Sequence, residues 1–125
     1  IYILSYTIQG IMAQFEFIAW LVQWLFEQTD FEFEWDQGNE IKSFQKHGIE
    51  VKVAEQFFKN RDCLAPLGIQ ISPASDEPRF GALGMDLLGN RLFVSFTIRG
   101  GRIRVISIRP MSQAERKQYA SIREK

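Results

Sequence analysis

Six arginines fall between residues 79 and 109 of this 125-residue chain, in a segment whose pattern predicts three consecutive β-strands. A guanidinium stays charged at physiological pH and grips phosphate oxygens in pairs, so their density raises the question of which anion they meet. The six are Arg79, Arg91, Arg99, Arg102, Arg104 and Arg109. The predicted strands are Arg79–Leu88, Arg91–Arg99 and Arg102–Arg109, joined by Gly89-Asn90 and Gly100-Gly101. Glycine favours such two-residue links, because it reaches the positive φ that tight hairpin turns need.

Strand alternation sorts these arginines by face. Arg102 and Arg104 share one face of the last strand, which makes them the best pair for clamping a phosphate. Arg79 is able to join them from across the sheet, and Arg99 lies on the face away from the expected core. Arg109 has the opposite parity and reaches the face of Arg102 and Arg104 only if a bulge intervenes. A solvated sheet face or a structural ion pair is the alternative for each arginine.

Two other residues have the chemistry to complement these cations. His47 is the only histidine, and an unperturbed pKa near ~6.5 suits proton transfer. It also follows a predicted helix, where a protonated imidazole gains roughly 0.3–1 kcal/mol from the helix dipole without any further role. Glu77 is a candidate general base or the ion-pair partner of Arg79, and Glu55 is a weaker candidate carboxylate. The residues alone leave these alternatives open.

The composition describes one small domain with an uneven charge distribution. With 46% hydrophobic and 14% aromatic residues the chain can bury a core, which excludes a disordered protein. Residues 1–78 hold five Lys/Arg against twelve Asp/Glu, whereas residues 79–125 hold ten against three. The basic half suits a polyanion, unless the halves simply neutralise each other. Cys63 is the only cysteine, so an intrachain disulfide is excluded, and we expect neither a metal site nor a cofactor.

The remaining pattern predicts helices and strands around the arginine segment. A strand is expected at Phe31–Trp35, a helix from Asp36 to Lys46, a helix at Val51–Lys59, a strand within Cys63–Ile71, and a helix from the capping box Ser112–Glu115 to Arg123. The order is β-α-α-β-β-β-β-α. We therefore predict an α+β fold, with an antiparallel sheet and helices packed on one side.

The first thirty residues form a predicted extension with an apolar helix at about Ala13–Gln28. A helix that is apolar on almost every side must be buried against the domain or a partner. Its longest uninterrupted apolar run, Phe17–Val22, is too short to span a membrane, and no basic residue precedes Lys42 as a signal peptide would require. We divide the chain into this extension, residues 1–30, and a domain at 31–125. The extension is native or results from an over-extended reading frame, since Met12 is the first plausible initiator.

A series of short motifs resembles the BrnT family of bacterial toxins, which belong to the RelE-like ribonuclease fold. The matching residues are Phe33-Glu-Trp-Asp36, Lys46-His-Gly48, Glu77-x-Arg79 with Gly84, Thr97-x-Arg99-Gly100, Arg102-Ile-Arg-Val-Ile-Ser107 with Arg109, and Glu115-Arg116 with Tyr119. The resemblance covers about residues 31–123 and leaves the extension without a counterpart. Ile108 and Pro110 depart from the pattern, where smaller or more basic residues are expected beside Arg109.

The resemblance implies a cytoplasmic endoribonuclease toxin of a type II toxin–antitoxin system that cleaves RNA without metal and inhibits translation. It implies a ribbon-helix-helix antitoxin as partner, operator DNA bound only by the toxin–antitoxin complex, autoregulation of the operon, and no membrane. Cleavage needs a proton acceptor, a proton donor and cations that stabilise the phosphorane. The expected catalytic residues are His47, Glu77, Arg79, Arg102 and Arg104. The expected RNA contacts are Lys46, Arg99, Arg109 and Tyr119, although a tyrosine on that helix is more often a core residue. The alternative is a non-catalytic protein or DNA-binding partner of an antitoxin-like regulator, because one histidine makes a thin catalytic set.

Overall fold

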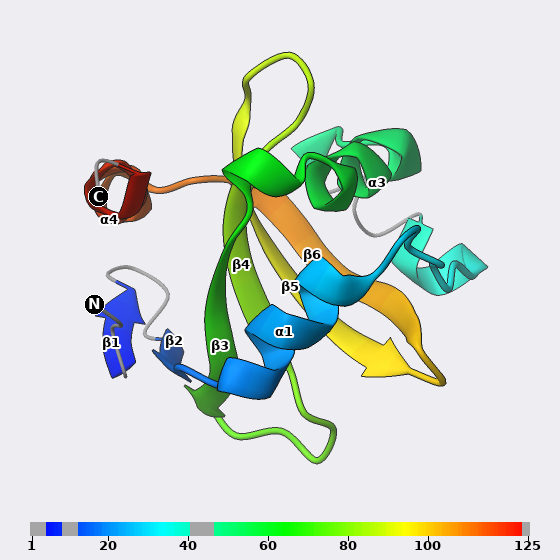
Figure 1. Ribbon diagram of the computed structural model, residues 1–125, viewed down its shortest axis with the longest axis horizontal. Coiled ribbons are helices and arrows are strands. Elements are labelled where there is room, and N and C mark those ends of the chain that lie inside the picture. Colours follow the sequence, from blue (N-terminus) through cyan, green and yellow to red (C-terminus); the bar gives the residue numbers. More distant parts are fainter. Residues whose placement is uncertain (1–4, 9–12, 41–46, 124–125) are drawn as a thin grey trace.

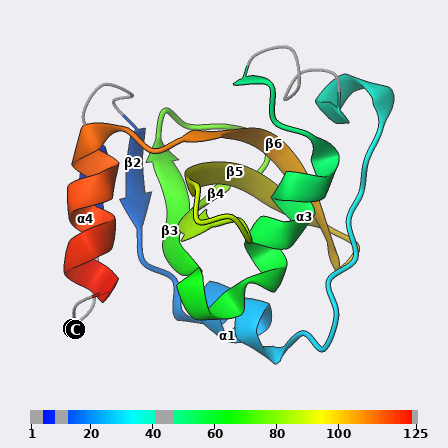
Figure 2. The same cartoon turned by 90° about the horizontal axis from the view of Figure 1, so that it is seen from above.

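The computed structural model describes residues 5–8, 13–40 and 47–123, and it shows one antiparallel sheet with helices on both faces (Figures 1 and 2). Six strands within these residues follow one another in the sheet in the order of the chain. They are β1 (Ser5–Ile8), β2 (Ala13–Glu16), β3 (Ala65–Ser72), β4 (Phe80–Met85), β5 (Arg91–Arg99) and β6 (Arg102–Pro110). The predicted α+β class is confirmed, and so are the strand within Cys63–Ile71 and the three-stranded meander, apart from shifts at strand ends.

The described helices are α1 (Ala19–Glu27), α3 (Val51–Lys59) and α4 (Gln113–Arg123), with a short 3-10 turn, η1 (Arg61–Cys63), after α3. The predicted bounds of α3 are confirmed, and α4 begins directly after Ser112, as its capping box predicts. Residues 37–40 are also helical. The rest of the helix predicted from Asp36 to Lys46 lies outside the described residues.

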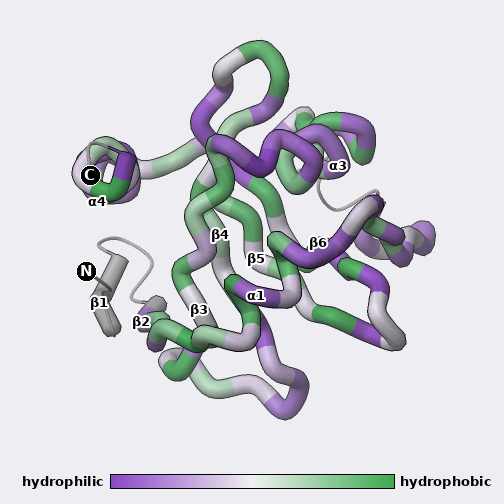
Figure 3. Tube along the Cα trace, in the orientation of Figure 1, coloured by the Kyte–Doolittle hydropathy of each residue, from purple (hydrophilic) through white to green (hydrophobic). Residues whose placement is uncertain are grey.

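Alternation along β5 places apolar side chains on both faces of the sheet. Val94 and Phe96 belong to a cluster formed with α1 and α3, whereas Phe93 belongs to a second cluster formed with Tyr119 of α4. The expectation that all helices pack on one side is therefore wrong, because α4 covers part of the opposite face (Figure 2). The hydropathy along the trace agrees, since hydrophobic residues predominate in β4 and β5 (Figure 3).

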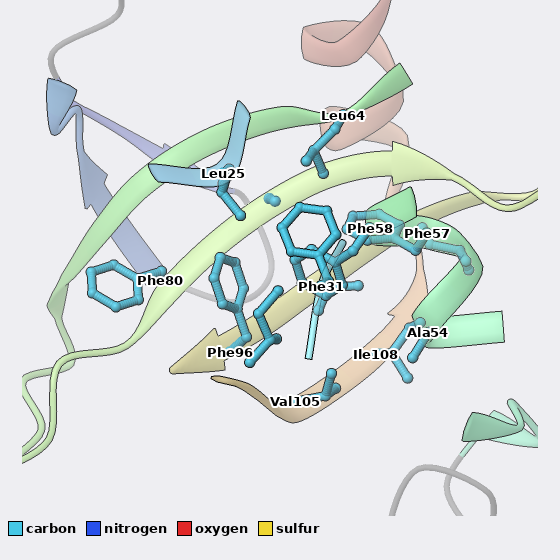
Figure 4. Packing of buried hydrophobic residues seen from close by; sticks show 14 of the residues in the cluster. Leu25, Phe31, Ala54, Phe57, Phe58, Leu64, Phe80, Phe96, Val105 and Ile108 are labelled. Carbon is cyan, nitrogen blue, oxygen red and sulfur yellow. The ribbon is translucent and has the colours of Figure 1, made fainter. Parts of the chain in front are cut away.

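Aromatic rings fill the larger cluster (Figure 4). Phe58 lies edge-on to Phe57 and to Phe96, with ring centroids 5.1 and 5.0 Å apart. Gly84 of β4 makes room for Phe57, since a Cβ at this glycine would lie 2.8 Å from the Phe57 ring. Edge-to-face aromatic pairs of this kind contribute about 0.5–1.5 kcal/mol each beyond the area they bury. This cluster fixes α3 on the central strands.

The N-terminal segment differs from the single buried helix expected at Ala13–Gln28. Its first part is strand β2, which pairs with β3, and helix α1 begins only at Ala19. In α1, Leu21 and Leu25 are buried in the larger cluster, while Trp20 remains 51% exposed. Residues on both sides of the expected boundary at residue 30 therefore share one sheet and one hydrophobic core. No helix among the described residues is both long enough and apolar enough to cross a lipid bilayer.

Two local predictions fail and one is confirmed. Phe31–Trp35 is not a full strand, because it meets β6 only through a parallel bridge between Phe33 and Ile103. The link from β4 to β5 is longer than the predicted Gly89-Asn90, because β4 ends at Met85 and β5 begins at Arg91. Within this loop the Asp86 carboxylate accepts hydrogen bonds from the amides of Leu88 and Asn90, each at 2.9 Å. The turn at Gly100-Gly101 is as predicted, with φ of 56° and 77°. It holds the ends of β5 and β6, and their arginines, together.

Candidate functional site

A bulge in β6 decides which arginines share a face of the sheet. Thr97 pairs with Arg104 and Phe96 with Val105, but Ser95 then pairs with Ser107, so Ile106 is an extra residue without a partner on β5. Directly paired residues project on the same face. The bulge therefore brings Arg109 to the face of Arg102 and Arg104. The sequence pattern had required such a bulge for Arg109 to reach this face.

The two ends of this sheet face carry different side chains. At the end near Phe93 it is covered by the second apolar cluster, which includes Met111 and Tyr119 from the chain at and after the end of β6. At the other end Arg99 pairs with Arg102 across the hairpin. This end carries charged side chains and is not covered by the second apolar cluster, and we call it the arginine cluster, consisting of Arg79, Arg99, Arg102 and Arg104.

Carboxylates from two segments reach the arginine cluster. Glu77, in the loop before β4, accepts hydrogen bonds from Arg99 Nε at 2.7 Å and Nη2 at 3.0 Å. Asp36 Oδ2 lies 2.8 Å from Arg104 Nη1, and Glu34 Oε1 lies 3.9 Å from Arg99 Nη1. Glu77 was a candidate partner of Arg79, but its hydrogen-bonded partner is Arg99. The pairs of Arg99 are about half exposed, so their main effect is on geometry and charge rather than on stability. In the third pair Arg104 is only 18% exposed and Asp36 is 55% exposed.

The electrostatics of the cluster follow from these pairs. Hydrogen bonding by Arg99 holds the pKa of Glu77 below its ordinary value, and the charges of Arg104 and Arg79 act in the same direction. The hydrogen bond from Arg104 likewise lowers the pKa of Asp36. Glu77 in turn raises the pKa of Arg99. Both carboxylates are therefore ionised at neutral pH and are weak proton acceptors.

Two arginines of the cluster remain available for a ligand. Arg79 and Arg102 are exposed and form no ion pair with any residue that the structure describes. Arg79 lies close enough to Glu77 for its charge to affect that carboxylate. An anion arriving at this face would meet two uncommitted guanidinium groups beside two that are already oriented.

Arg109 and Tyr119 were expected to contact RNA, and both are committed to the protein interior instead. Arg109 donates to both carboxylate oxygens of Glu115 at 2.7 and 2.8 Å and stacks over the Phe93 ring at 4.4 Å. Tyr119 is 3% exposed and donates its hydroxyl to the carbonyl of Cys63. Burial raises the pKa of this phenol. A ring so enclosed has no free face for stacking on a base in this structure. Contact of Arg109 or Tyr119 with RNA stays a prediction, and neither residue belongs to the arginine cluster.

The expected proton-transfer region is described only in part. Lys46 lies outside the described residues. His47 is half-buried and helical, and Gly48 follows with φ of 66°, the left-handed conformation that ends helices. The predicted stop at Gly48 is thus confirmed, while a catalytic role for His47 stays a prediction. Glu55, the weaker candidate base, accepts a hydrogen bond from Trp35 Nε1 at 2.8 Å and so holds the segment at residue 35 against α3.

Sequence reasoning missed Glu34 as a member of the site and placed Asp36 only at the start of a helix, where a capping side chain is expected. The cap itself is present, since the amide of Asn39 donates to Asp36 Oδ1 at 3.1 Å. The available signal was the alternation of acidic and aromatic residues, which puts Glu34 and Asp36 on one side of an extended segment. No group of three or more His, Cys, Asp and Glu side chains suited to a metal ion occurs in the described part of the chain.

Comparison with known proteins places these residues in a family context. The family model described as "Ribonuclease toxin, BrnT, of type II toxin-antitoxin system" matches residues 35–115, which include the whole arginine cluster and Asp36. The crystal structure of the Brucella abortus ribonuclease toxin BrnT is similar with a TM-score of 0.49 and 24% identity, over 66% of this chain and 99% of that chain. No curated protein matches this sequence.

Proposed function

Because the chain belongs to the BrnT family of ribonuclease toxins of type II toxin–antitoxin systems, we propose that it cleaves RNA at the arginine cluster without a metal ion. The observation that carries this proposal is the gathering of Arg79, Arg99, Arg102 and Arg104 at one end of one sheet face. A phosphate that becomes a phosphorane gains negative charge, and preorganised guanidinium groups stabilise that charge.

In the proposed reaction the 2′-hydroxyl oxygen attacks the adjacent phosphorus and the bond to the 5′-oxygen breaks. The products are a 2′,3′-cyclic phosphate and a 5′-hydroxyl. Arg79 and Arg102 bind the phosphate oxygens, while Arg99 and Arg104 complete the cation field. Each arginine stays protonated throughout, so the proton must move through other groups.

We assign the proton transfers to His47 rather than to Glu77. The lowered pKa of Glu77 makes it a weak base, and its hydrogen bonds to Arg99 already occupy both oxygens. A histidine titrates near neutral pH and can act as base and then as acid. Glu77 then serves to orient Arg99. Lys46, which precedes His47 and lies outside the described residues, stays a candidate phosphate contact.

For the wider system we propose neutralisation by a ribbon-helix-helix antitoxin, with which the toxin binds operator DNA and represses its operon. A type II family implies an antitoxin partner and an RNA target, which supports this part of the proposal. Free toxin would then inhibit translation by cutting RNA. Co-expression with and without the neighbouring reading frame tests this directly, and toxicity unaffected by that frame would contradict it.

The test of the chemistry uses purified toxin free of antitoxin, in EDTA. The wild-type protein should release RNA fragments ending in 2′,3′-cyclic phosphate. We expect Arg102→Ala/Arg104→Ala to lower kcat/KM by roughly 100-fold or more, since two phosphate contacts are lost. The matched control is Arg116→Ala/Lys117→Ala, which removes the same charge from exposed positions of α4. Equal activity of the two double variants would rule out the arginine cluster as the site.

One observation favours the alternative, a non-catalytic partner of an antitoxin-like regulator. Arg99 and Arg104 are already paired with carboxylates of the same chain, as cations in a purely structural surface would be. Under this alternative the wild-type protein binds its antitoxin and cleaves no RNA in EDTA or in Mg²⁺. Cleavage that the control double variant retains decides against it.

A further inference from the structure

The carboxylate of Asp36 is shared between a helix start and the arginine cluster. Its Oδ1 accepts a hydrogen bond from the amide of Asn39 at 3.1 Å, and Asn39 Oδ1 accepts one from the amide of Asp36 at 2.8 Å. The two residues thus cap each other where helical residues 37–40 begin. The other oxygen, Oδ2, lies 2.8 Å from Arg104 Nη1. One side chain therefore connects this helical segment to β6.

The cap is itself attached to the strand that carries Arg104. Asn39 is buried, and its Nδ2 donates to the carbonyl of Val105 at 3.2 Å and to that of Glu34 at 3.3 Å. Val105 is the next residue after Arg104. The two hydrogen bonds between Asp36 and Asn39, together with the one from Asn39 to Val105, therefore hold Asp36 against β6 without involving Arg104.

The Arg104 side chain is 18% exposed and its Nη1 is buried, and Asp36 is the carboxylate that pairs with it among the described residues. A free arginine side chain has about 2 kcal/mol of rotamer entropy, which must be lost when the guanidinium meets a phosphate in one geometry. Asp36 fixes Nη1 in advance, and a guanidinium with five N–H donors retains others for a ligand. The Asp36 carboxylate also repels an incoming phosphate, so this arrangement weakens ground-state binding while it orients the cation.

We infer that Asp36 is a positioning residue, which holds Arg104 in the orientation that stabilises the transition state of RNA cleavage. The inference rests on the proposed function, because it assigns Asp36 a part in the same reaction. Asp36 touches no reacting atom and acts only through Arg104. Its cap to Asn39 makes it the fixed member of the pair.

The decisive variant is Asp36→Asn in the full-length protein. Asparagine caps helices as well as aspartate does, so the cap and the fold should be retained while the charge is lost. We expect kcat for RNA to fall roughly 10-fold, because Arg104 is misplaced. KM should fall about threefold, because one carboxylate no longer repels the phosphates. The control is Asp30→Asn, an exposed position without an ion pair among the described residues, which should change neither parameter.

The direction of each change separates the explanations. If kcat rises while KM falls, Asp36 competes with RNA for Arg104 and does not position it. If kcat falls with an unchanged KM and a lowered melting temperature, Asp36 is structural only. Unchanged kcat and KM would also overturn the inference. A wild-type protein that cleaves no RNA would overturn the proposed function together with it, whereas an active wild type and an unaffected variant would overturn the inference alone.

A double-mutant cycle provides the second readout. If Asp36 acts through Arg104, adding Asp36→Asn to Arg104→Lys should change kcat by less than about twofold, since lysine lacks the planar fork that Asp36 orients. An additional loss of kcat as large as in the wild-type background would contradict this coupling. Should Asp36→Asn fail to fold, Asp36→Ser keeps a capping side chain without the charge and carries the same expectations.

Discussion

Arg109 and Glu115 form a two-pronged ion pair, with N–O distances of 2.7 and 2.8 Å, in which the carboxylate is completely buried. Glu115 also accepts a hydrogen bond from the amide of Ser112 at 2.8 Å and thereby completes the capping box of α4. The pair joins the end of β6 to the first turn of α4. It explains why an arginine of a basic strand serves the fold and not the arginine cluster.

The first prediction concerns this pair. Arg109→Met should lower the free energy of unfolding by about 3 kcal/mol, because a buried carboxylate is left without its partner. Urea unfolding measures the change, and RNA cleavage by the folded variant should be unaffected. The double variant Arg109→Met/Glu115→Leu should recover part of the loss, since neither charge is then buried alone. A loss of RNA affinity with unchanged stability would return Arg109 to the binding site.

A second prediction tests how firmly the N-terminal strand belongs to the sheet. Gly68 of β3 has φ of 120°, and a Cβ there would lie 1.9 Å from the carbonyl oxygen of Glu16 in β2. Gly68→Ala should therefore lower the free energy of unfolding by about 2 kcal/mol or more, through strain and displacement of β2. Gly89→Ala is the control, because Gly89 has φ of 85° and no atom within 4 Å of the added Cβ.

The control should show only the strain of the left-handed backbone, about 1 kcal/mol. Thermal or urea unfolding of the two variants gives the comparison. Equal stabilities would mean that the close approach of β2 to Gly68 contributes nothing, and that the N-terminal strand is dispensable for the rest of the sheet.

Local signals in the sequence predicted much of the fold. The apolar period of Val51–Lys59, the capping box at Ser112 and the glycine pair at Gly100-Gly101 each depend on residues a few positions apart. The condition for Arg109, a bulge in β6, was also readable from alternation. Each of these features is decided by backbone geometry within one element or one hairpin.

Features that depend on contacts between distant segments were missed. By strand alternation Phe93, Ser95 and Thr97 share the face of Arg99, which was expected to point away from the core, yet all three are buried. Phe15 and Tyr119, from opposite ends of the chain, form part of the cluster with Phe93, and no local pattern reveals that covering. The pairing of Asp36 with Arg104 is of the same kind, because it needs the 32–34 segment to lie along β6. Hence the sequence indicates the cations of the site and one carboxylate, Glu77, but not that Glu34 and Asp36 pair with the arginines.

A third prediction is the loss of stability in acid. Hydrogen bonds from Arg104 and Arg99 lower the pKa values of Asp36 and Glu77 from ordinary values of 3.8 and 4.5. Burial alone would raise the pKa of Asp86, but hydrogen bonds from Asn90, Leu88 and Gly89 outweigh it and the pKa is lowered. Below their ordinary pKa values the unfolded chain binds more protons at these carboxyl groups than the folded chain does. The groups therefore stabilise the fold fully above pH 4.5, and this stabilisation is lost as the pH falls through their lowered pKa values.

Urea unfolding between pH 7 and pH 2 checks this prediction. The free energy of unfolding should be level down to about pH 5 and then decline. In Asp86→Asn the decline should be shallower and the value at neutral pH lower, because a carboxylate that holds the β4–β5 loop is gone. Asp30→Asn should follow the wild-type curve. An equally steep decline in Asp86→Asn would show that Asp86 contributes nothing to the acid limb.

The last prediction separates uncommitted from committed arginines by the salt dependence of RNA binding. Each phosphate contact to a single strand contributes about −0.7 to the slope of log K against log salt concentration, through counterion release. Arg102 is exposed and unpaired among the described residues, so Arg102→Ala should reduce the magnitude of the slope by about 0.7 and weaken binding uniformly across RNA sequences. An oligonucleotide with 2′-O-methyl groups measures binding without cleavage. Arg109→Met should leave the slope of the wild-type protein unchanged, because Arg109 is paired with Glu115, which is buried in the first turn of α4. A slope that both variants alter equally would place the RNA along the whole of β6 rather than at the arginine cluster.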